Sequence, residues 1–545
     1  MYVNPDSIRT AYPAAWPQYP FDETPETPEA SMPRYSICPE EGIRIPMRDG
    51  VKLAADIFRP YAPGEKFPAL VAWSCYSRQL QHTPVPLGQN EAGITQFWTP
   101  RGYVHVVVDA RGSNDSDGVW DFCGPVEQHD LFETIEWAAS QPWCNGNVGM
   151  VGCSYYARSQ IMVAGSHQPP SLKAIFPYDA ATDMYRDSCF HGGIPSDGFL
   201  RGWFANMSYL NFWGGRLKDP SGFHHHFQTA LGLKHPLDCE YYQERSAWPR
   251  LDRINVPTYF GCDWQFYQLH LRGAFSGWEG VTGVPKRMLI GPVPQPRRPF
   301  ANYHQEALRW YDQWLKGMDT RVMEGPPIQL YIQGEDVWRS EDEWPLARTV
   351  WTDFHLGGPP KGLEGALSES PGSDGERTYE YDPLSEESRY GNPRLVYRTE
   401  PMTRPMEVTG PVVLNLAAKS SAEDTDWFVV LMDEGPDGKS RTLTKGWLRA
   451  SHREADAERS KPWQPWHTHA REIPLTPNQP ETFAIEIMPT CNVFQPGHRV
   501  RLEIASCDSV ADNFFWYHAA KAIKARNTVL EGSGGSRLVL PVIPR

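Results

Sequence analysis

One serine stands in a context that favours nucleophilic chemistry. Residues 149–157 read GMVGCSYYA, and this pattern predicts a strand that ends before Ser154, a sharp turn at Ser154 and a helix after it. Such a turn exposes the hydroxyl at the carboxyl end of a sheet, where the N–H groups that open the helix stabilise an oxyanion. The motif departs from G-x-S-x-G because Tyr156 stands at the second glycine position. A buried structural serine after a strand is the alternative interpretation.

A serine hydroxyl becomes a good nucleophile only when a base takes its proton, so the histidines decide what Ser154 can do. The segment GPVPQPRRP at 291–299, which follows a predicted strand, contains no histidine. The next histidine along the chain is His304, which opens a helical segment. We take His304 as the candidate base, with the alternative that it only fills and caps this helix. His270 and His191 are the other candidate bases.

The candidate acid is Asp263, the only carboxylate in the segment GCDWQ at 261–265, which follows another predicted strand. A carboxylate at this place can orient a base. Strand-end aspartates also cap loops, and Gln265 is the alternative occupant of the acid position. The segment WSCY at 73–76 ends an earlier strand, where the second oxyanion donor of such folds is found, so the Tyr76 phenol is a candidate donor. A packed loop tyrosine is the alternative for Tyr76.

The remaining composition limits the function classes. A formal charge of −14 and a pI near 5.7 disfavour nucleic acids and anionic membrane surfaces as partners. The ten cysteines show no zinc spacing and predict reduced thiols, hence a cytoplasmic location, and the chain start does not resemble a signal peptide. The consecutive histidines at 224–226 point in different directions, so we expect a solvated loop there. We predict no metal and no other cofactor.

Elements that would position these residues can be read from the hydrophobic pattern. The segment 42–60 reads as a hairpin with an Asp-Gly turn. Continuous apolar runs predict buried parallel strands, and an amphipathic pattern at 128–140 predicts a helix between two of them. The expected strands lie at 68–73, 103–108, 148–151, 256–260, 287–290 and 328–332, with a further helix at 304–316. This alternation predicts an α/β fold with a parallel sheet.

The domain organisation follows from where this alternation stops. Residues 168–249 are rich in Gly, Trp, Tyr and His, and we expect an inserted cap there. The α/β domain would then comprise 1–167 and 250–348. Short β-branched runs separated by Gly and Pro turns fill 349–545 and predict an antiparallel β domain.

Several motifs together resemble the cocaine-esterase-like (CocE/NonD) hydrolases, which are related to X-Pro dipeptidyl peptidases. They are RDGVKLAADIFRP at 48–60, DARGSNDSDG at 109–118, GCSYYA at 152–157 and RWYDQWLKG at 309–317. Shorter motifs of the last third resemble the same family: TG at 409–410, DTDWF at 424–428, GWLR at 446–449 and PGHR at 496–499. The resemblance therefore covers nearly the whole chain.

The resemblance implies an α/β-hydrolase domain with an inserted helical cap and a C-terminal β jelly-roll. It implies hydrolysis of a small-molecule acyl ester or amide by Ser, Asp and His in that chain order, without a cofactor. The oxyanion donors that it implies are the Tyr76 phenol and the Tyr155 N–H. The family often dimerises, so a homodimer is an expectation. Because no histidine follows Gly291-Pro292, a non-hydrolytic enzyme of acyl transfer or cyclisation, or a binding protein, is the alternative.

Overall fold

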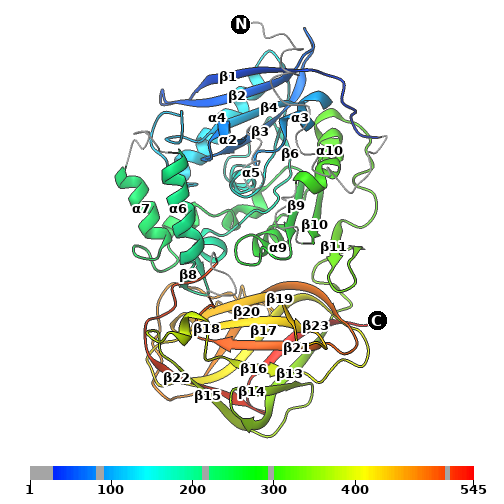
Figure 1. Ribbon diagram of the computed structural model, residues 1–545. Coiled ribbons are helices and arrows are strands. Elements are labelled where there is room, and N and C mark those ends of the chain that lie inside the picture. Colours follow the sequence, from blue (N-terminus) through cyan, green and yellow to red (C-terminus); the bar gives the residue numbers. More distant parts are fainter. Residues whose placement is uncertain (1–28, 82–90, 212–219, 293–299, 510–515) are drawn as a thin grey trace.

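The computed structural model describes residues 29–81, 91–211, 220–292, 300–509 and 516–545. An α/β part and a β-rich C-terminal part lie one above the other (Figure 1). The helices α6 and α7 project at one side of the α/β part, above the strands of the C-terminal part.

The α/β part is built on a sheet of ten strands, most of them parallel. The order is β1-β2-β4-β3-β5-β6-β9-β10-β11-β12, and the strands from β4 to β11 pair in parallel, whereas β1, β2 and β12 pair in antiparallel. Their bounds are Ile37–Pro46 (β1), Lys52–Pro60 (β2), Val104–Asp109 (β4), Phe67–Ser74 (β3), Cys144–Met150 (β5), Leu172–Ile175 (β6), Thr258–Asp263 (β9), Lys286–Gly291 (β10), Ile328–Ile332 (β11) and Val337–Glu341 (β12).

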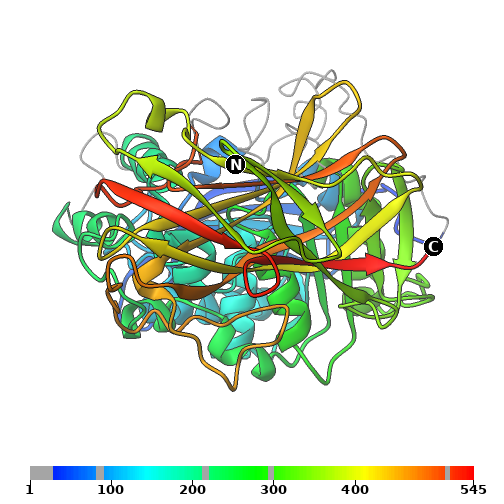
Figure 2. The same cartoon turned by 90° about the horizontal axis from the view of Figure 1, so that it is seen from below.

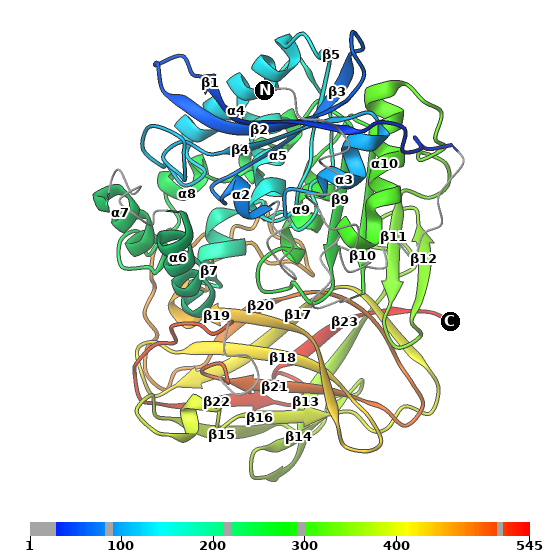
Figure 3. The same ribbon diagram turned by 45° about the horizontal axis from the view of Figure 1, so that its top comes forward.

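Helices cover both faces of this sheet because its inner strands are apolar on both sides. Along β3, Val71 and Trp73 join the cluster that contains α4, α5 and α9, whereas Leu70 and Ala72 join the cluster that contains α3 and α10. The covering helices are α3 (Thr95–Trp98), α4 (Pro125–Ser140), α5 (Tyr155–Ser166), α9 (Leu271–Gly280) and α10 (Phe300–Lys316). Figure 3 shows α10 and α3 near each other at one side of the sheet.

The segment between β5 and β9 contributes both a strand and a set of peripheral helices. Residues 172–175 form β6 in the main sheet, although the sequence pattern places the whole of 168–249 in a cap. The helices are α6 (Asp197–Asn211), α7 (Pro220–Ala230) and α8 (Glu240–Glu244), and β7 (Phe190–His191) pairs with β8 (Ile194–Pro195). His224, His225 and His226 lie on α7, so the expectation of a loop there is wrong. This helix has eleven residues, and Phe223 and Phe227 pack against the core.

The C-terminal part is a closed β-barrel, consistent with a jelly-roll. Pairing of β23 with β17 closes nine strands, and β15 and β22 extend the same sheet (Figure 2). The strands are β13 (Val350–Lys361), β14 (Glu364–Ser368), β15 (Gly375–Tyr381), β16 (Leu395–Arg398), β17 (Met406–Ser420), β18 (Asp426–Glu434), β19 (Ser440–Arg449), β20 (Glu481–Phe494), β21 (Arg499–Ala505), β22 (Ala525–Glu531) and β23 (Arg537–Ile543).

A buried ion-pair network joins the two parts. Arg272 on α9 contacts Asp187 at 3.0 Å and Glu486 on β20 at 3.2 Å. Removing one member of such a network leaves an uncompensated buried charge, so the network fixes how α9 sits on the barrel. No helix in the described ranges is long and apolar enough to cross a lipid bilayer.

Candidate active site

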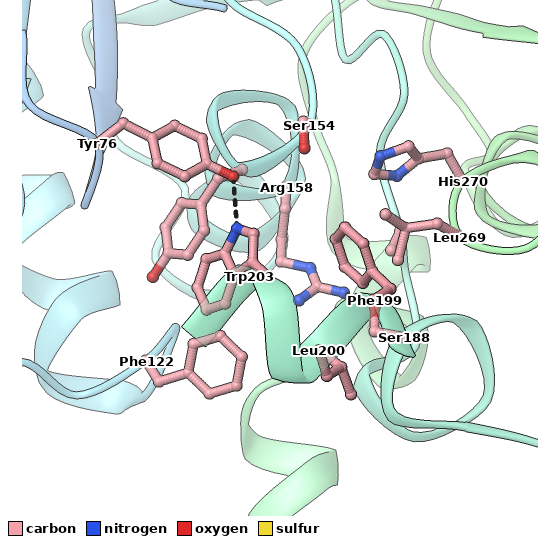
Figure 4. Close-up of a pocket in the computed structure, with 12 residues that line it drawn as sticks. Tyr76, Phe122, Ser154, Arg158, Ser188, Phe199, Leu200, Trp203, Leu269 and His270 are labelled. Atoms are coloured by element: carbon pink, nitrogen blue, oxygen red, sulfur yellow. Dashed lines mark hydrogen bonds between the residues drawn. The ribbon is translucent and has the colours of Figure 1, made fainter. Parts of the chain in front are cut away.

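A pocket brings the serine turn together with side chains of the peripheral helices (Figure 4). Aromatic and aliphatic side chains form most of the wall. The lining residues are Tyr76, Phe122, Ser154, Tyr155, Arg158, Ala181, Ser188, Phe199, Leu200, Trp203, Leu269 and His270.

Ser154 adopts the strained backbone that the sequence pattern predicts. It stands between β5 and α5 with φ 61° and ψ −118°, a conformation that is costly for a residue with a side chain. Gly152 permits this turn: its φ is +127°, and a Cβ there would lie 2.3 Å from the Tyr156 Cβ. Tyr156 is fully buried, so it packs against the turn from the second-glycine position and does not obstruct the hydroxyl of Ser154.

The N-terminus of α5 opens beside the Ser154 hydroxyl. Tyr155 is the first residue of this helix, so its N–H has no acceptor within the helix. The Ser154 N–H is already used, since it donates to the Tyr178 carbonyl at 3.2 Å. Tyr155 is held in place by its side chain, whose hydroxyl donates to Glu127 at 2.6 Å. Burial raises the pKa of the Glu127 carboxyl to about 8.

Tyr76 faces the same space from the end of β3. Its hydroxyl oxygen accepts a hydrogen bond from the Trp203 indole N–H at 3.0 Å, which is the dashed line in Figure 4. An indole N–H can only donate, so the Tyr76 oxygen acts as the acceptor and its own hydrogen is directed elsewhere. Accepting a hydrogen bond also polarises the phenol and strengthens it as a donor.

The loop after β4 and the end of that strand form hydrogen bonds with the residues on both sides of Tyr76. The Asn114 amide donates to the Cys75 carbonyl at 3.1 Å, and the Arg78 N–H donates to Asp109 at 2.9 Å. Arg78 also forms an ion pair with Asp109, although burial raises the pKa of that carboxyl to about 6. The segment 109–118 therefore anchors the residues on both sides of Tyr76.

His270 is the histidine that lines the pocket. Figure 4 shows its ring on the side of the cavity where Ser154 lies. It directly precedes α9, and its N–H donates to the Phe266 carbonyl at 2.9 Å, while the Phe266 N–H donates to the Asp263 carbonyl at 3.0 Å. No hydrogen bond joins the Ser154 hydroxyl to a residue of the described ranges. Such bonds are often long in an empty site and shorten when substrate binds.

Asp263 lies at the end of β9, buried beside the serine turn. Its carboxylate accepts a hydrogen bond from the Tyr178 hydroxyl at 3.1 Å, and the Tyr178 carbonyl accepts the Ser154 N–H. Asp263 does not line the pocket itself. Its contacts place it where it orders two segments, the serine turn and the loop that leads to His270.

His304 and His191 lie outside this pocket. His304 is fully buried between Phe97, on which it stacks at 4.4 Å, and Trp98. Burial lowers its pKa to about 3. His191 stacks on Trp447 and shares a 2.7 Å hydrogen bond with His518. The structure thus brings together Ser154, Tyr76 and Tyr155 of the predicted residues, and not His304.

Sequence reasoning missed the side chains that shape the pocket. Phe199, Leu200 and Trp203 come from α6, and only the tertiary structure places them opposite Ser154. Arg158 carried a usable pattern, because it follows the serine by four residues and so lies about one helical turn into α5. Among the described residues, no group of three or more His, Cys, Asp or Glu side chains could hold a metal ion.

Known proteins resemble this chain over nearly its whole length. Residues 49–294 match the family of X-Pro dipeptidyl-peptidase (S15 family), and 320–532 match the X-Pro dipeptidyl-peptidase C-terminal non-catalytic domain. Cocaine esterase from Rhodococcus sp. (strain MB1 Bresler) is 30% identical, over 87% of this chain and 91% of that protein. The chain belongs to the CocE/NonD hydrolase family.

Solved structures agree with the family fold. A CocE/NonD family hydrolase from Staphylococcus aureus is 25% identical, with a TM-score of 0.81, over 93% of this chain and 94% of that one. An alpha-amino acid ester hydrolase shares the fold at 22% identity, with a TM-score of 0.73, over 95% and 98% of the two chains. The predicted family and fold class are confirmed, and the chain is a member of a family of serine esterases and peptidases.

Proposed function

We propose that this CocE/NonD protein hydrolyses an ester or amide of a small molecule, with Ser154 as the nucleophile. The observation that carries the proposal is the convergence of Ser154, Tyr76 and Tyr155 on one pocket, at a turn whose strain serves to present a hydroxyl. Strained backbone of this kind gathers at functional sites.

The oxyanion would be stabilised by two donors. As the Ser154 oxygen attacks the acyl carbon, the carbonyl oxygen gains negative charge. The donors would be the Tyr155 N–H at the helix N-terminus and the Tyr76 hydroxyl, since both residues line the pocket. Donors fixed before the reaction cost no reorganisation when the charge forms.

We assign the base to His270 and a positioning role to Asp263. His270 would take the proton of Ser154 and give it to the leaving alcohol or amine, and a water molecule would then release the acyl group by the same route. His304 is a poor base for this step because it packs between Phe97 and Trp98, away from the pocket lining. A base after β9 takes the place of the histidine that residues 291–299 lack.

A fluorophosphonate probe tests the proposal directly. Wild type and Ser154→Ala are treated and weighed by intact mass spectrometry, with the exposed Ser140→Ala as the matched serine control. We expect one adduct on wild type and on Ser140→Ala, and none on Ser154→Ala. Folded wild-type protein that forms no adduct and cleaves no aryl ester would contradict hydrolysis and leave the non-hydrolytic alternative.

A further inference from the structure

A buried guanidinium lines the same pocket as Ser154. Arg158 is 8% exposed, and Figure 4 shows its side chain extending from α5 toward the part of the pocket where Ser188, Phe199 and Leu200 lie. It donates to the Ser188 hydroxyl at 2.6 Å and to the Met184 sulfur at 3.2 Å. Both acceptors are neutral, so neither balances its charge.

The other buried arginines donate to carboxylates or to backbone carbonyls. Arg287 donates to two backbone carbonyls. The remainder each form an ion pair with at least one carboxylate: Arg78, Arg111, Arg186, Arg245, Arg272, Arg377 and Arg449. Within the described ranges, no carboxylate lies within ion-pair distance of Arg158. A buried charge without a partner is costly, which is why such groups are paired or serve a ligand.

The acidic groups near the pocket are already engaged. Glu127 accepts from Tyr155 and from the Cys123 N–H, and burial raises its pKa to about 8. Asp187 pairs with Arg272. Burial raises the pKa of the Cys123 thiol to about 12, so this neighbour of Arg158 also stays neutral. The positive charge of Arg158 therefore faces the cavity without a counter-charge from these groups.

The position of Arg158 relates its charge to the serine turn. Arg158 follows Ser154 by four residues, its N–H donates to the Ser154 carbonyl at 2.8 Å, and both residues line the pocket. A single small molecule can therefore reach both. Apolar side chains of Phe122, Leu200 and Leu269 form part of the wall, and an ion pair is stronger beside such side chains than in bulk water.

We propose that the site selects esters or amides that carry a free carboxylate, bound by Arg158 while the carbonyl to be cleaved lies at Ser154. This inference rests on the hydrolase function proposed above and adds the substrate class. The carboxylate belongs either to the acyl part or to the leaving group, separated from the reacting carbonyl by a short spacer.

Two matched pairs of aryl esters distinguish these sources. Mono-4-nitrophenyl adipate carries a carboxylate on the acyl part, and its methyl ester is the neutral equivalent. 4-Acetoxybenzoate carries the carboxylate on the leaving group, and its methyl ester is again the neutral equivalent. We expect wild type to prefer the anionic member of one pair by about tenfold to a hundredfold in kcat/KM, after subtraction of spontaneous hydrolysis. Arg158→Gln should abolish that preference, and Arg158→Lys should retain part of it.

Arg201→Gln is the matched control, because Arg201 is an arginine of α6 that pairs with Asp197 and does not line the pocket. It should keep the wild-type ratio. Equal rates for both members of both pairs, in a wild-type protein that cleaves them, would overturn the inference and leave hydrolysis intact.

Binding without turnover separates the two proposals. On Ser154→Ala protein, calorimetric titration with monomethyl adipate and 4-acetoxybenzoate should show tighter binding of one anion than of its neutral methyl ester, and Arg158→Gln should remove the difference. If Ser154→Ala binds neither anion more tightly, the inference fails whatever the hydrolysis result. If it binds an anion through Arg158 while wild type cleaves no ester, the carboxylate site stands and the hydrolase proposal fails.

Discussion

The Arg158 N–H donates to the Ser154 carbonyl at 2.8 Å, so the serine turn and the buried guanidinium are joined at the first turn of α5. Any motion of this first turn moves both groups together. The position of Arg158 relative to the serine turn is therefore set by the start of α5 rather than by a flexible loop.

Substitutions of His270 and His304 should have opposite effects on fluorophosphonate labelling. His270→Gln should lower kcat/KM for a neutral aryl ester by about 10²–10⁴-fold, because a positioned base contributes that much, and should abolish fluorophosphonate labelling. His304→Phe should keep the labelling, because His304 packs between aromatic rings outside the pocket. Circular dichroism confirms that both variants are folded. Loss of labelling in folded His304→Phe alone would show that the base is assigned to the wrong histidine.

Removal of one oxyanion donor tests Tyr76. Tyr76→Phe should lower kcat by about 10²–10³-fold with little change in KM, since the phenol acts on charge that develops during the reaction. The exposed Tyr390→Phe serves as the control. A fall in affinity with kcat unchanged would indicate that Tyr76 only shapes the pocket.

The backbone of the serine turn predicts that Gly152 does not tolerate a larger residue. Gly152→Ala should destabilise the protein by about 2–4 kcal/mol, because the new Cβ meets Tyr156 and the Glu91 carbonyl and the backbone has positive φ. Gly534→Ala, where a Cβ meets no atom within 4 Å, should be neutral. Urea unfolding of both variants measures the difference. A Gly152→Ala protein as stable as wild type would mean that the turn relaxes without cost.

Buried histidines predict a loss of stability in mild acid. Burial lowers the pKa of His304 and of His191 to about 3, whereas an unfolded histidine titrates near 6.5. Between these values the unfolded chain binds more protons, so stability is fully present above about pH 6.5 and falls as the pH decreases. At pH 5 the loss is about 2 kcal/mol for each histidine.

Thermal unfolding at pH 7.5 and pH 5 measures this effect. His304→Phe should reduce the drop in Tm between the two pH values, because its aromatic ring can fill the same space without a proton to bind. His224→Gln, on the exposed face of α7, should leave the drop unchanged. A drop that His304→Phe leaves as large as in wild type would place the acid sensitivity elsewhere.

The sheet and the serine turn could be predicted from the sequence because their patterns are local. The apolar run at 68–73 lies within β3, the run at 103–108 overlaps β4, and the GMVGCSYYA motif forms the turn at Ser154. The base taken from the sequence, His304, lies outside the pocket, and only the tertiary structure shows that His270 lines it. Strand β6 was missed because four residues are too short for a periodic pattern. The cytoplasmic location and the homodimer stay predictions.

Phe199 of the pocket wall contacts the segment between β21 and β22 of the C-terminal part. Phe199 stacks on Trp516 at 4.7 Å, and the Gly198 N–H donates to the Tyr517 carbonyl at 2.8 Å. The C-terminal part therefore supports one wall of the pocket. Under the proposed function, replacing the last third of this chain with that of a homologue would change this wall and leave the Ser154 turn unchanged, which offers protein engineers a route to new substrates.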